Sequence, residues 1–303
     1  MEKRKILIGI MCAVACQFIF GFSLIFTRAA MDLVSPMTLL SWRFIVAFAA
    51  LSVCMIIGVI KVELRGKSLG PIIWIAVLFP FIYFVGETIG ISLTSASESA
   101  AMLAVLPVST LLCSVLLLKI MPTKLQVTGI VVTASGIAIV VLVQGLDAVF
   151  NPIGYAMLLL AIVTYSLYAV FVQKAETFTS AEKSYVMTAL GAAVFTVIAL
   201  VENGMRGTLT AFVLLPFTNV DFFITVLYLG IGSSAVAFLL YNSAIANIGA
   251  ARVASFAGIS SIVAVIAGVV ILQERFTVFQ GVGVVLVVGG AYLANVMPKG
   301  EVD

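Results

Sequence analysis

The sequence predicts an all-α, polytopic membrane protein with ten transmembrane helices in two inverted-topology five-helix repeats. Three observations predict this class. Of the 303 residues, 63% are hydrophobic and only 10% are charged, whereas soluble chains carry about 25% charged residues. Ten apolar segments are long enough to cross a bilayer, which takes about 20 residues. Finally, the stretch 96–136 recurs at 250–290.

The predicted spans follow one another through short connections. Only the connection 203–221 is long, and we expect it to lie along the membrane surface. The first span follows Lys3-Arg4-Lys5, as the apolar part of a signal peptide does, but it is too long for one. The spans are expected at 6–29, 36–60, 70–93, 97–118, 125–145, 152–173, 184–202, 222–246, 251–272 and 278–297.

The repeat appears when the sequence is shifted by 154 positions, which needs no gap. Over 51 aligned positions, 10 are identical, about twice the number that chance gives in so apolar a chain. Both copies read as a helix, a turn beginning Thr-x-x-Gln-x-x-Gly, and a second helix. The aligned pairs are Ala96 with Ala250, Ala100 with Ala254, Thr123 with Thr277, Gln126 with Gln280, Gly129 with Gly283, and Gly136 with Gly290.

The two copies are five spans apart, an odd number, so equivalent helices run in opposite directions. The chain is therefore expected to divide into a first repeat, 1–148, and a second repeat, 149–303. Inverted repeats place a substrate site near the bilayer midplane and rock against each other around it. This architecture is typical of transporters.

The lysines and arginines set the orientation, because cytoplasmic loops carry an excess of them. With the N-terminus in the cytoplasm, twelve fall on the inner side and three, Arg28, Arg206 and Arg275, on the outer side. Both termini are therefore predicted in the cytoplasm, with the protein in the inner (plasma) membrane. The twelve are Lys3, Arg4, Lys5, Lys61, Arg65, Lys67, Lys119, Lys124, Lys174, Lys183, Arg252 and Lys299.

Several function classes find no support in the composition. The net charge of +3 is scattered, so we predict no nucleic-acid binding. There is no histidine, the commonest metal ligand and catalytic base. The four cysteines all lie in apolar stretches and are interpreted as reduced packing residues. We predict no metal, no cofactor and no catalytic residues.

Two ionisable residues lie well within predicted spans, where a charge costs about 2.5–3.5 kcal/mol on insertion scales. Arg43 follows Trp42 in the second span, and Glu87 lies in the outer third of the third span. One interpretation is a gate or substrate contact, in which the guanidinium holds a carboxylate and the glutamate holds an amine or a proton. The other is a structural ion pair between the two. The glutamate is also the natural group for coupling to protons.

Deep polar aromatic residues are candidates for the lining of a central cavity, because their hydroxyls would find no partner in lipid. The candidates are Tyr83, Tyr168 and Tyr241, together with Asn242. Ordinary hydrogen bonding between helices would explain each of them equally well.

Prolines and glycines mark bends and close contacts. Pro80 and Pro107 are expected to kink the third and fourth spans and to serve a gate. Glycines in the fifth and tenth spans admit a neighbouring backbone and hold the two repeats together or form a homodimer surface. These packing glycines are Gly129, Gly136, Gly283 and Gly290.

The order of short motifs along the chain resembles the ten-helix drug/metabolite transporters of the EamA type. In the first half the resemblance rests on Phe20-Gly21, Trp42-Arg43-Phe44, Glu87, 93–97 and Leu106-Pro107-Val108. In the second half it rests on 241–245, 272–275 and the glycine-rich helix at 281–290.

The resemblance implies a carrier of small metabolites, often outward, through a cavity lined mainly by spans one to four and six to nine. Two positions depart from the family pattern. The Gly-Glu usual at the end of the fourth span is Lys119-Ile120 here, and the proline usual in the ninth span is Ser260-Ser261. A role for that glutamate therefore does not transfer to this chain.

The sequence thus predicts a secondary transporter that exports small metabolites, amino-acid-like or other small organic solutes, by alternating access. Its expected partners are the solute, the lipid bilayer and protons that couple to transport, and it is expected to be a monomer or a homodimer. Two rivals remain, a lipid flippase and a membrane-embedded enzyme that acts on a lipid. A polar central cavity would favour the carrier, and a lateral groove open to lipid would favour the flippase.

Overall fold

The described part of the protein is built from helices. The computed structural model describes residues 2–94, 99, 102–103, 105–119, 121–144, 151–271 and 278–295. Within these residues, seven helices are long and apolar enough to cross a membrane. The elements are α1 Glu2–Met31, α2 Pro36–Ile56, α3 Gly70–Ala76, η1 Val77–Ile82, α4 Tyr83–Leu93, α6 Leu106–Leu118, α7 Lys124–Gln144, α8 Pro152–Lys174, α9 Ser180–Arg206, α10 Leu209–Thr218, α11 Val220–Leu227, η2 Tyr228–Val236, α12 Ala237–Ile248, α13 Ala250–Ser255, α14 Ala257–Ile271 and α15 Val278–Asn295.

These elements group into ten consecutive passes, as the hydropathy predicts. The third pass combines α3, the π-helical segment η1 and α4, and the eighth combines α11, the π-helical segment η2 and α12. The ninth is divided into α13 and α14. The short helix α10 occupies the long connection between α9 and α11. The chain is therefore a multi-pass helical membrane protein.

Side-chain caps fix where several passes begin. The Ser35 hydroxyl accepts a hydrogen bond from the Thr38 amide, and Asn151 caps α8 in the same way. Thr179 and Glu182 form a capping box at the start of α9. Such caps satisfy amide groups that have no partner inside the helix. These three passes therefore begin at defined residues.

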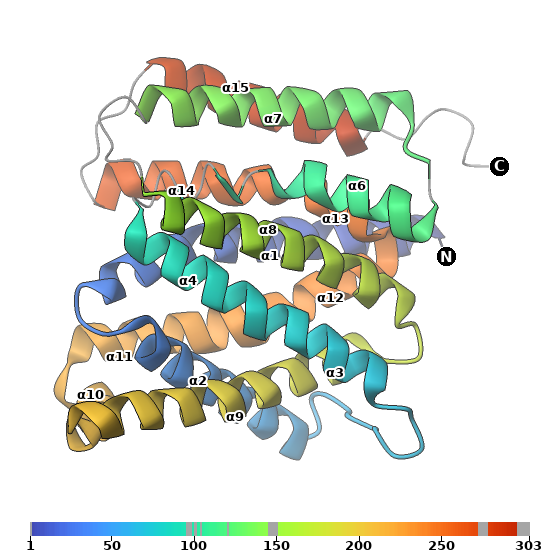
Figure 1. The fold of residues 1–303 in the computed structure, drawn as a ribbon. Helices are drawn as coiled ribbons and strands as arrows, with labels where there is room; N and C mark the ends of the chain where they lie inside the picture. The colour runs from blue at the N-terminus through green and yellow to red at the C-terminus, as the bar shows by residue number, and fades with distance from the viewer. Residues whose placement is uncertain are drawn as a thin grey trace.

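The two halves of the fold run in opposite directions. In Figure 1, α1, α4 and α7 run from the right side to the left, whereas their counterparts α8, α12 and α15 run from left to right. Contacts between helices follow the same relation. Helix α1 packs on α12 as α8 packs on α4, and α1 packs on α14 as α8 packs on α6. The packing therefore has the pseudo-twofold symmetry expected of inverted repeats.

The two π-helical segments lie at equivalent places in the repeats. A shift of 154 positions moves η1 onto residues 231–236, the second part of η2. Each segment packs on the second helix of the opposite repeat, η2 on α2 and η1 on α9. Such π-helical turns are rare and often lie at functional sites. Here they line the contact between the repeats.

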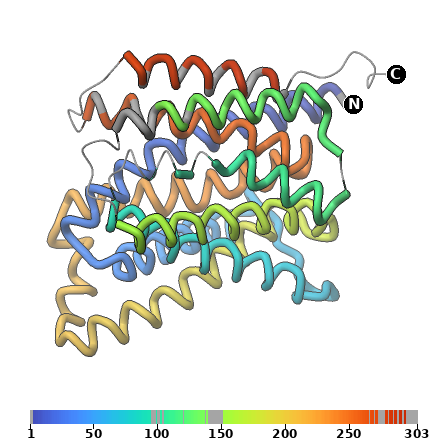
Figure 2. Tube along the Cα trace, turned by 45° about the horizontal axis from the view of Figure 1, so that its top comes forward, coloured from blue at the N-terminus to red at the C-terminus, as the bar shows by residue number. Residues whose placement is uncertain are grey.

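Helices α7 and α15 pack on each other along one side of the protein (Figure 2). Gly129, Gly136, Gly283 and Gly290 are all buried. A Cβ added at Gly290 would overlap the Thr133 amide nitrogen and the Gly129 carbonyl oxygen. Only glycine permits this distance between the two backbones. The contact joins the last helix of one repeat to the last helix of the other.

A methyl group at position 290 tests this contact. Gly290→Ala would push a Cβ into the backbone of α7, whereas Gly289→Ala adds the same group where nothing lies within 4 Å. Both changes gain about 1 kcal/mol of helix propensity, so their difference isolates the packing. We expect Gly290→Ala to be less stable than Gly289→Ala by about 1–3 kcal/mol, measured as thermal unfolding in detergent. Equal stability of the two variants would contradict the contact.

Candidate functional site

A cavity lies between the two repeats and contains about 490 Å³ of space that no atom occupies, its open part included. Its walls come from α1, α2, η1, α4, α6, α8 and α14. The lining residues are Gln17, Phe20, Ser23, Leu24, Arg43, Phe79, Tyr83, Phe84, Glu87, Leu103, Leu106, Tyr165, Ser260 and Ser261.

Arg43 is the fully buried cation of this cavity, with 1% of its surface exposed. It lies two turns into α2, whose start is fixed by the Ser35 cap. Its Nε donates to the Ser234 hydroxyl at 2.7 Å and its Nη2 donates to the Ser233 hydroxyl at 2.9 Å. Both serines belong to η2. The guanidinium of the first repeat is therefore held by the second.

Two further features position Arg43: a contact of its guanidinium with an aromatic ring, and the close approach of η2 to α2. Its Cζ lies 4.2 Å from the centre of the Phe84 ring, a cation–π contact that gains strength when water is excluded. Gly230 lets η2 approach α2 closely, because a Cβ at that position would lie 2.9 Å from the Arg43 carbonyl oxygen. The serine hydroxyls reach the guanidinium because this residue is glycine.

Glu87 is the buried carboxylate of the cavity, with 7% of its surface exposed. It lies one turn after Tyr83 on α4, and the Tyr83 hydroxyl donates to its Oε1 at 2.5 Å. The ion pairs among the described residues are Lys67–Glu182 and Arg206–Glu202. Arg43 and Glu87 thus line one cavity but do not form the structural ion pair that one interpretation of the sequence expected.

Other polar side chains also face the cavity. Ser23 donates to the Phe20 carbonyl oxygen and Ser260 to that of Ala257, which leaves both hydroxyl oxygens free to accept. Gln17 is 2% exposed, and its Nε2 has no hydrogen-bond partner among the residues that the structure describes. Buried polar groups in proteins are nearly always paired, so Gln17 calls for a partner from outside the chain.

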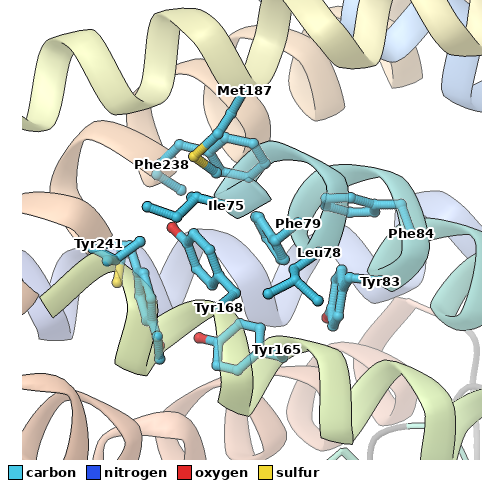
Figure 3. Packing of buried hydrophobic residues seen from close by; sticks show 14 of the residues in the cluster. Ile75, Leu78, Phe79, Tyr83, Phe84, Tyr165, Tyr168, Met187, Phe238 and Tyr241 are labelled. Carbon is cyan, nitrogen blue, oxygen red and sulfur yellow. The ribbon is translucent and has the colours of Figure 1, made fainter. Parts of the chain in front are cut away.

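A layer of aromatic rings packs beside the cavity (Figure 3). Phe79 and Tyr165 line the cavity itself. Behind them, Tyr168 stacks on Phe79 with ring centres 4.4 Å apart, and Phe238 lies 5.0 Å from Phe79. Tyr241 contacts both tyrosines at 5.3 and 6.0 Å. These rings are all buried and belong to one continuous packed cluster.

Three of the expected lining residues lie within this layer or next to it and do not line the cavity. The Tyr168 hydroxyl donates to the Asn242 amide oxygen at 2.8 Å, and the Asn242 amide donates to Ser184 at 2.9 Å. Tyr168, Tyr241 and Asn242 are all buried. The polar groups of Tyr168 and Asn242 thus satisfy each other within the second repeat, as the alternative interpretation had it. Of the four candidates, only Tyr83 lines the cavity.

Trp42 and Pro107 do not lie as expected, whereas the third pass does kink at Pro80, because the preceding residue Phe79 has non-helical φ and ψ angles of −145° and 111°. The Trp42 indole donates to the Phe212 carbonyl oxygen on α10 at 3.1 Å, so the ring points away from the cavity. Pro80 lies within η1. Pro107 lies in the first turn of α6 and does not kink it, because a proline at that position removes no helical hydrogen bond.

The sequence reasoning missed Gln17, Ser233 and Ser234. Gln17 carried a usable signal, since an amide in a span of apolar residues must face a polar partner. The serine pair carried none, because serine is common in transmembrane helices and bonds its own backbone there. The pair lies about 190 positions from Arg43 in the sequence, so its contact with the guanidinium could be seen only in the fold.

Comparison with known proteins decides the family. The model of the EamA-like transporter family matches residues 7–142 and again residues 152–296. This chain belongs to the EamA-like transporter family. The two matches leave one five-helix repeat on each side of the connection between α7 and α8.

Individual relatives agree with this membership. The EamA-like chain is 31% identical to the "Uncharacterized transporter YcxC" of Bacillus subtilis (strain 168) over 298 residues, which cover 98% of this chain and 95% of the relative. It is 25% identical over 154 residues to the "Uncharacterized transporter in sor 3'region" of Acidianus ambivalens, covering 51% and 56% of the two chains. A solved crystal structure shares the fold, with a TM-score of 0.73 at 16% identity, covering 98% of this chain and all of the other.

Removal of the two serine hydroxyls tests how Arg43 is held. The double variant Ser233→Ala/Ser234→Ala leaves a buried guanidinium without its acceptors, and each such bond contributes about 1.5–3 kcal/mol. We expect a clear loss of thermal stability in detergent, while Ser135→Ala, at an exposed hydroxyl bonded to its own helix, has little effect.

Adding Arg43→Met to the double variant should restore part of the loss, because an unpaired buried charge is worse than an apolar residue. A double variant as stable as the Ser135→Ala control would show that the hydroxyls do not hold Arg43.

Proposed function

We propose that this EamA-like protein is a secondary transporter that moves small organic solutes by alternating access through the cavity between its repeats. The observation that carries the proposal is a partly polar cavity lined by both inverted repeats, in which Arg43 and Glu87 are both buried without a direct ion pair between them. Charged groups inside a membrane are costly and commonly mark a substrate or ion pathway. The names of the relatives support a carrier over an enzyme.

Contacts between the repeats keep one side of this cavity shut. Besides the aromatic layer, Lys67 in the connection between α2 and α3 forms an ion pair of 2.7 Å with Glu182 at the start of α9. Glu182 also accepts from the Glu63 amide and is 2% exposed. This contact joins the first repeat to the second on the side where α1 begins. It has to open when the cavity faces that side.

The distribution of positive charge supports cytoplasmic termini in the plasma membrane. In that orientation the Lys67–Glu182 contact lies on the cytoplasmic side of the protein. The cavity then lies between this contact and the external side. We propose transport outward, as the family resemblance implies. A solute would then enter after the cytoplasmic contact opens and leave when that contact has closed again.

Glu87 is the proposed proton-coupling group. It is buried in the cavity, where its carboxyl group accepts a hydrogen bond from the Tyr83 hydroxyl. A proton on Glu87 removes the anion from the cavity and changes which solute the cavity holds. The exchange of a proton for a solute follows if the two compete for this carboxylate.

The structure also contains a lateral groove between α1 and α14, the feature that would suit a lipid flippase. It is about 880 Å³ in size, open part included, and is lined by nine apolar residues, among them Phe18, Phe22 and Ile266. A flippase must pass a polar headgroup through the bilayer, and this lining offers no polar side chain for one. The polar central cavity therefore favours a carrier of soluble compounds.

Glu87→Gln tests proton coupling, because the amide oxygen keeps the Tyr83 hydrogen bond while the titrating group is lost. The solute would first be found by comparing metabolite efflux from expressing and non-expressing cells. In liposomes, we expect Glu87→Gln to lose the response to a pH gradient, at least about tenfold in rate, which corresponds to about 1.4 kcal/mol. Glu63→Gln, at an exposed position, should behave as the wild type. Unchanged gradient-driven transport by Glu87→Gln would rule out this role.

A further inference from the structure

The lateral groove between α1 and α14 has buried side chains at its base and exposed side chains at its edge. Val263 and Ala267 line it and are buried, one turn apart on α14. Ile266 and Val270 follow the same i, i+4 spacing on the neighbouring row and are exposed. Because Ala267 carries only a methyl group, it leaves space that a larger side chain would fill.

The two sides of the groove belong to different repeats. Phe18 and Phe22, one turn apart on α1, line it from the first repeat, and the α14 residues line it from the second. The two helices touch at Gly21, where an added Cβ would overlap the Val263 side chain and the Ser260 carbonyl oxygen. Val263 lines the groove, whereas Ser260 lines the central cavity. One contact between the repeats therefore lies between the groove and the cavity.

The groove is open to the hydrocarbon of the bilayer. Its exposed edge lies on α1 and α14, which belong to passes through the membrane. Every described residue that lines it is apolar, so water and polar headgroups find no hydrogen-bond partner there. An empty groove would also be unfavourable, because side chains that face a void lose their dispersion contacts. The matching occupant is a hydrocarbon chain.

The dimensions of the groove favour a single acyl tail. Its lining runs from Ile259 to Ile271, about 18 Å of helix, and one leaflet provides about 15 Å of hydrocarbon, half of the bilayer core. The groove volume of about 880 Å³, spread over this length, gives a mean cross-section of about 50 Å². An α-helix with its side chains is about 10 Å across and takes up about 80 Å². A helix of a second copy is therefore too wide to enter, whereas an unbranched tail is slim enough.

The position of the groove along the two helices assigns the leaflet. Phe18 and Phe22 lie in the second half of α1. The α14 residues likewise belong to the second part of the ninth pass, which begins at Ala250. Both passes run outward when the N-terminus is cytoplasmic. The groove then lies in the outer half of the bilayer.

We infer that the lateral groove binds one acyl tail of an outer-leaflet phospholipid, held between α1 and α14. The tail is a resident ligand and not cargo, because its headgroup stays at the surface. Since the two walls belong to different repeats, the bound tail favours the arrangement in which α1 and α14 meet at Gly21 and shifts the population toward it. The inference goes beyond the carrier function and does not depend on it, since the tail binds whether or not a solute is moved.

Photolabelling of the wild-type protein tests the inference. The protein would be placed in liposomes of phosphatidylethanolamine and phosphatidylglycerol, with a small fraction of phosphatidylethanolamine that carries a diazirine in one acyl tail. Mass spectrometry would locate the labelled residues. We expect labelling at Ile266 to exceed that at Val197, an exposed residue of α9, at least about threefold, because the groove contacts the tail from several sides. Equal labelling at the two residues would show only the ordinary lipid shell and would overturn the inference.

A side chain that fills the groove gives a second test. Ala267→Phe places a ring in the groove, and Val197→Phe adds the same ring at the exposed control position. Labelling at Ile266 should fall at least about threefold in Ala267→Phe, because the ring takes the place of the tail, and stay unchanged in Val197→Phe. Gel filtration and thermal unfolding in detergent show whether both variants fold, and the wild-type comparison stands without them. Undiminished labelling at Ile266 in a folded Ala267→Phe protein would contradict the bound tail.

A cysteine at the edge of the groove tests the rival occupant, a second copy of the chain. Ile266→Cys would be introduced in a variant without the four native cysteines, and membranes would be oxidised before solubilisation. We expect a monomer, since a lipid tail carries no thiol. A disulfide-linked dimer would assign the groove to a second copy and overturn the inference.

Discussion

Arg43 sets the constraint on which the rest of this structure depends. A guanidinium inside a bilayer needs hydrogen-bond acceptors, and lipid tails offer none. The acceptors are Ser233 and Ser234, which belong to the opposite repeat. They reach the guanidinium because η2 packs closely on α2 at Gly230. One buried cation thus ties the two repeats together at the wall of the cavity and leaves most of its own donors free.

The inverted repeats give the protein a symmetric frame, but the chemistry of the cavity is not symmetric. A shift of 154 positions places Glu87 on Tyr241, which belongs to the aromatic layer and does not line the cavity. The same shift places Pro80 on Ser234, a partner of Arg43, and Pro107 on Ser261 in the cavity wall. The frame supplies two equivalent halves that can rock, while one half carries the carboxylate and the other the serines. A single binding site between two halves is what alternating access requires.

Much of the fold could be predicted from the sequence, because hydropathy and the positions of lysine and arginine define spans in a membrane. Arg43 and Glu87 were recognisable as site residues for the same reason, since charge is rare in apolar spans. The rotation of each helix could not be predicted. A span that is apolar all round gives no sign of which face meets protein, so Tyr168, Tyr241 and Asn242 were expected in the cavity and lie behind it. The partners of Arg43 depend on packing between distant segments.

Access to the cavity from both sides of the membrane is the central claim, and cysteine labelling tests it most directly. Ser261 lines the cavity, and Ser261→Cys would be placed in a variant without Cys12, Cys16, Cys54 and Cys113. A membrane-impermeant maleimide would be added to intact cells and, separately, to inside-out vesicles. Alternating access predicts that the thiol reacts in both preparations. A thiol that reacts from one side only, with or without solute, would contradict it.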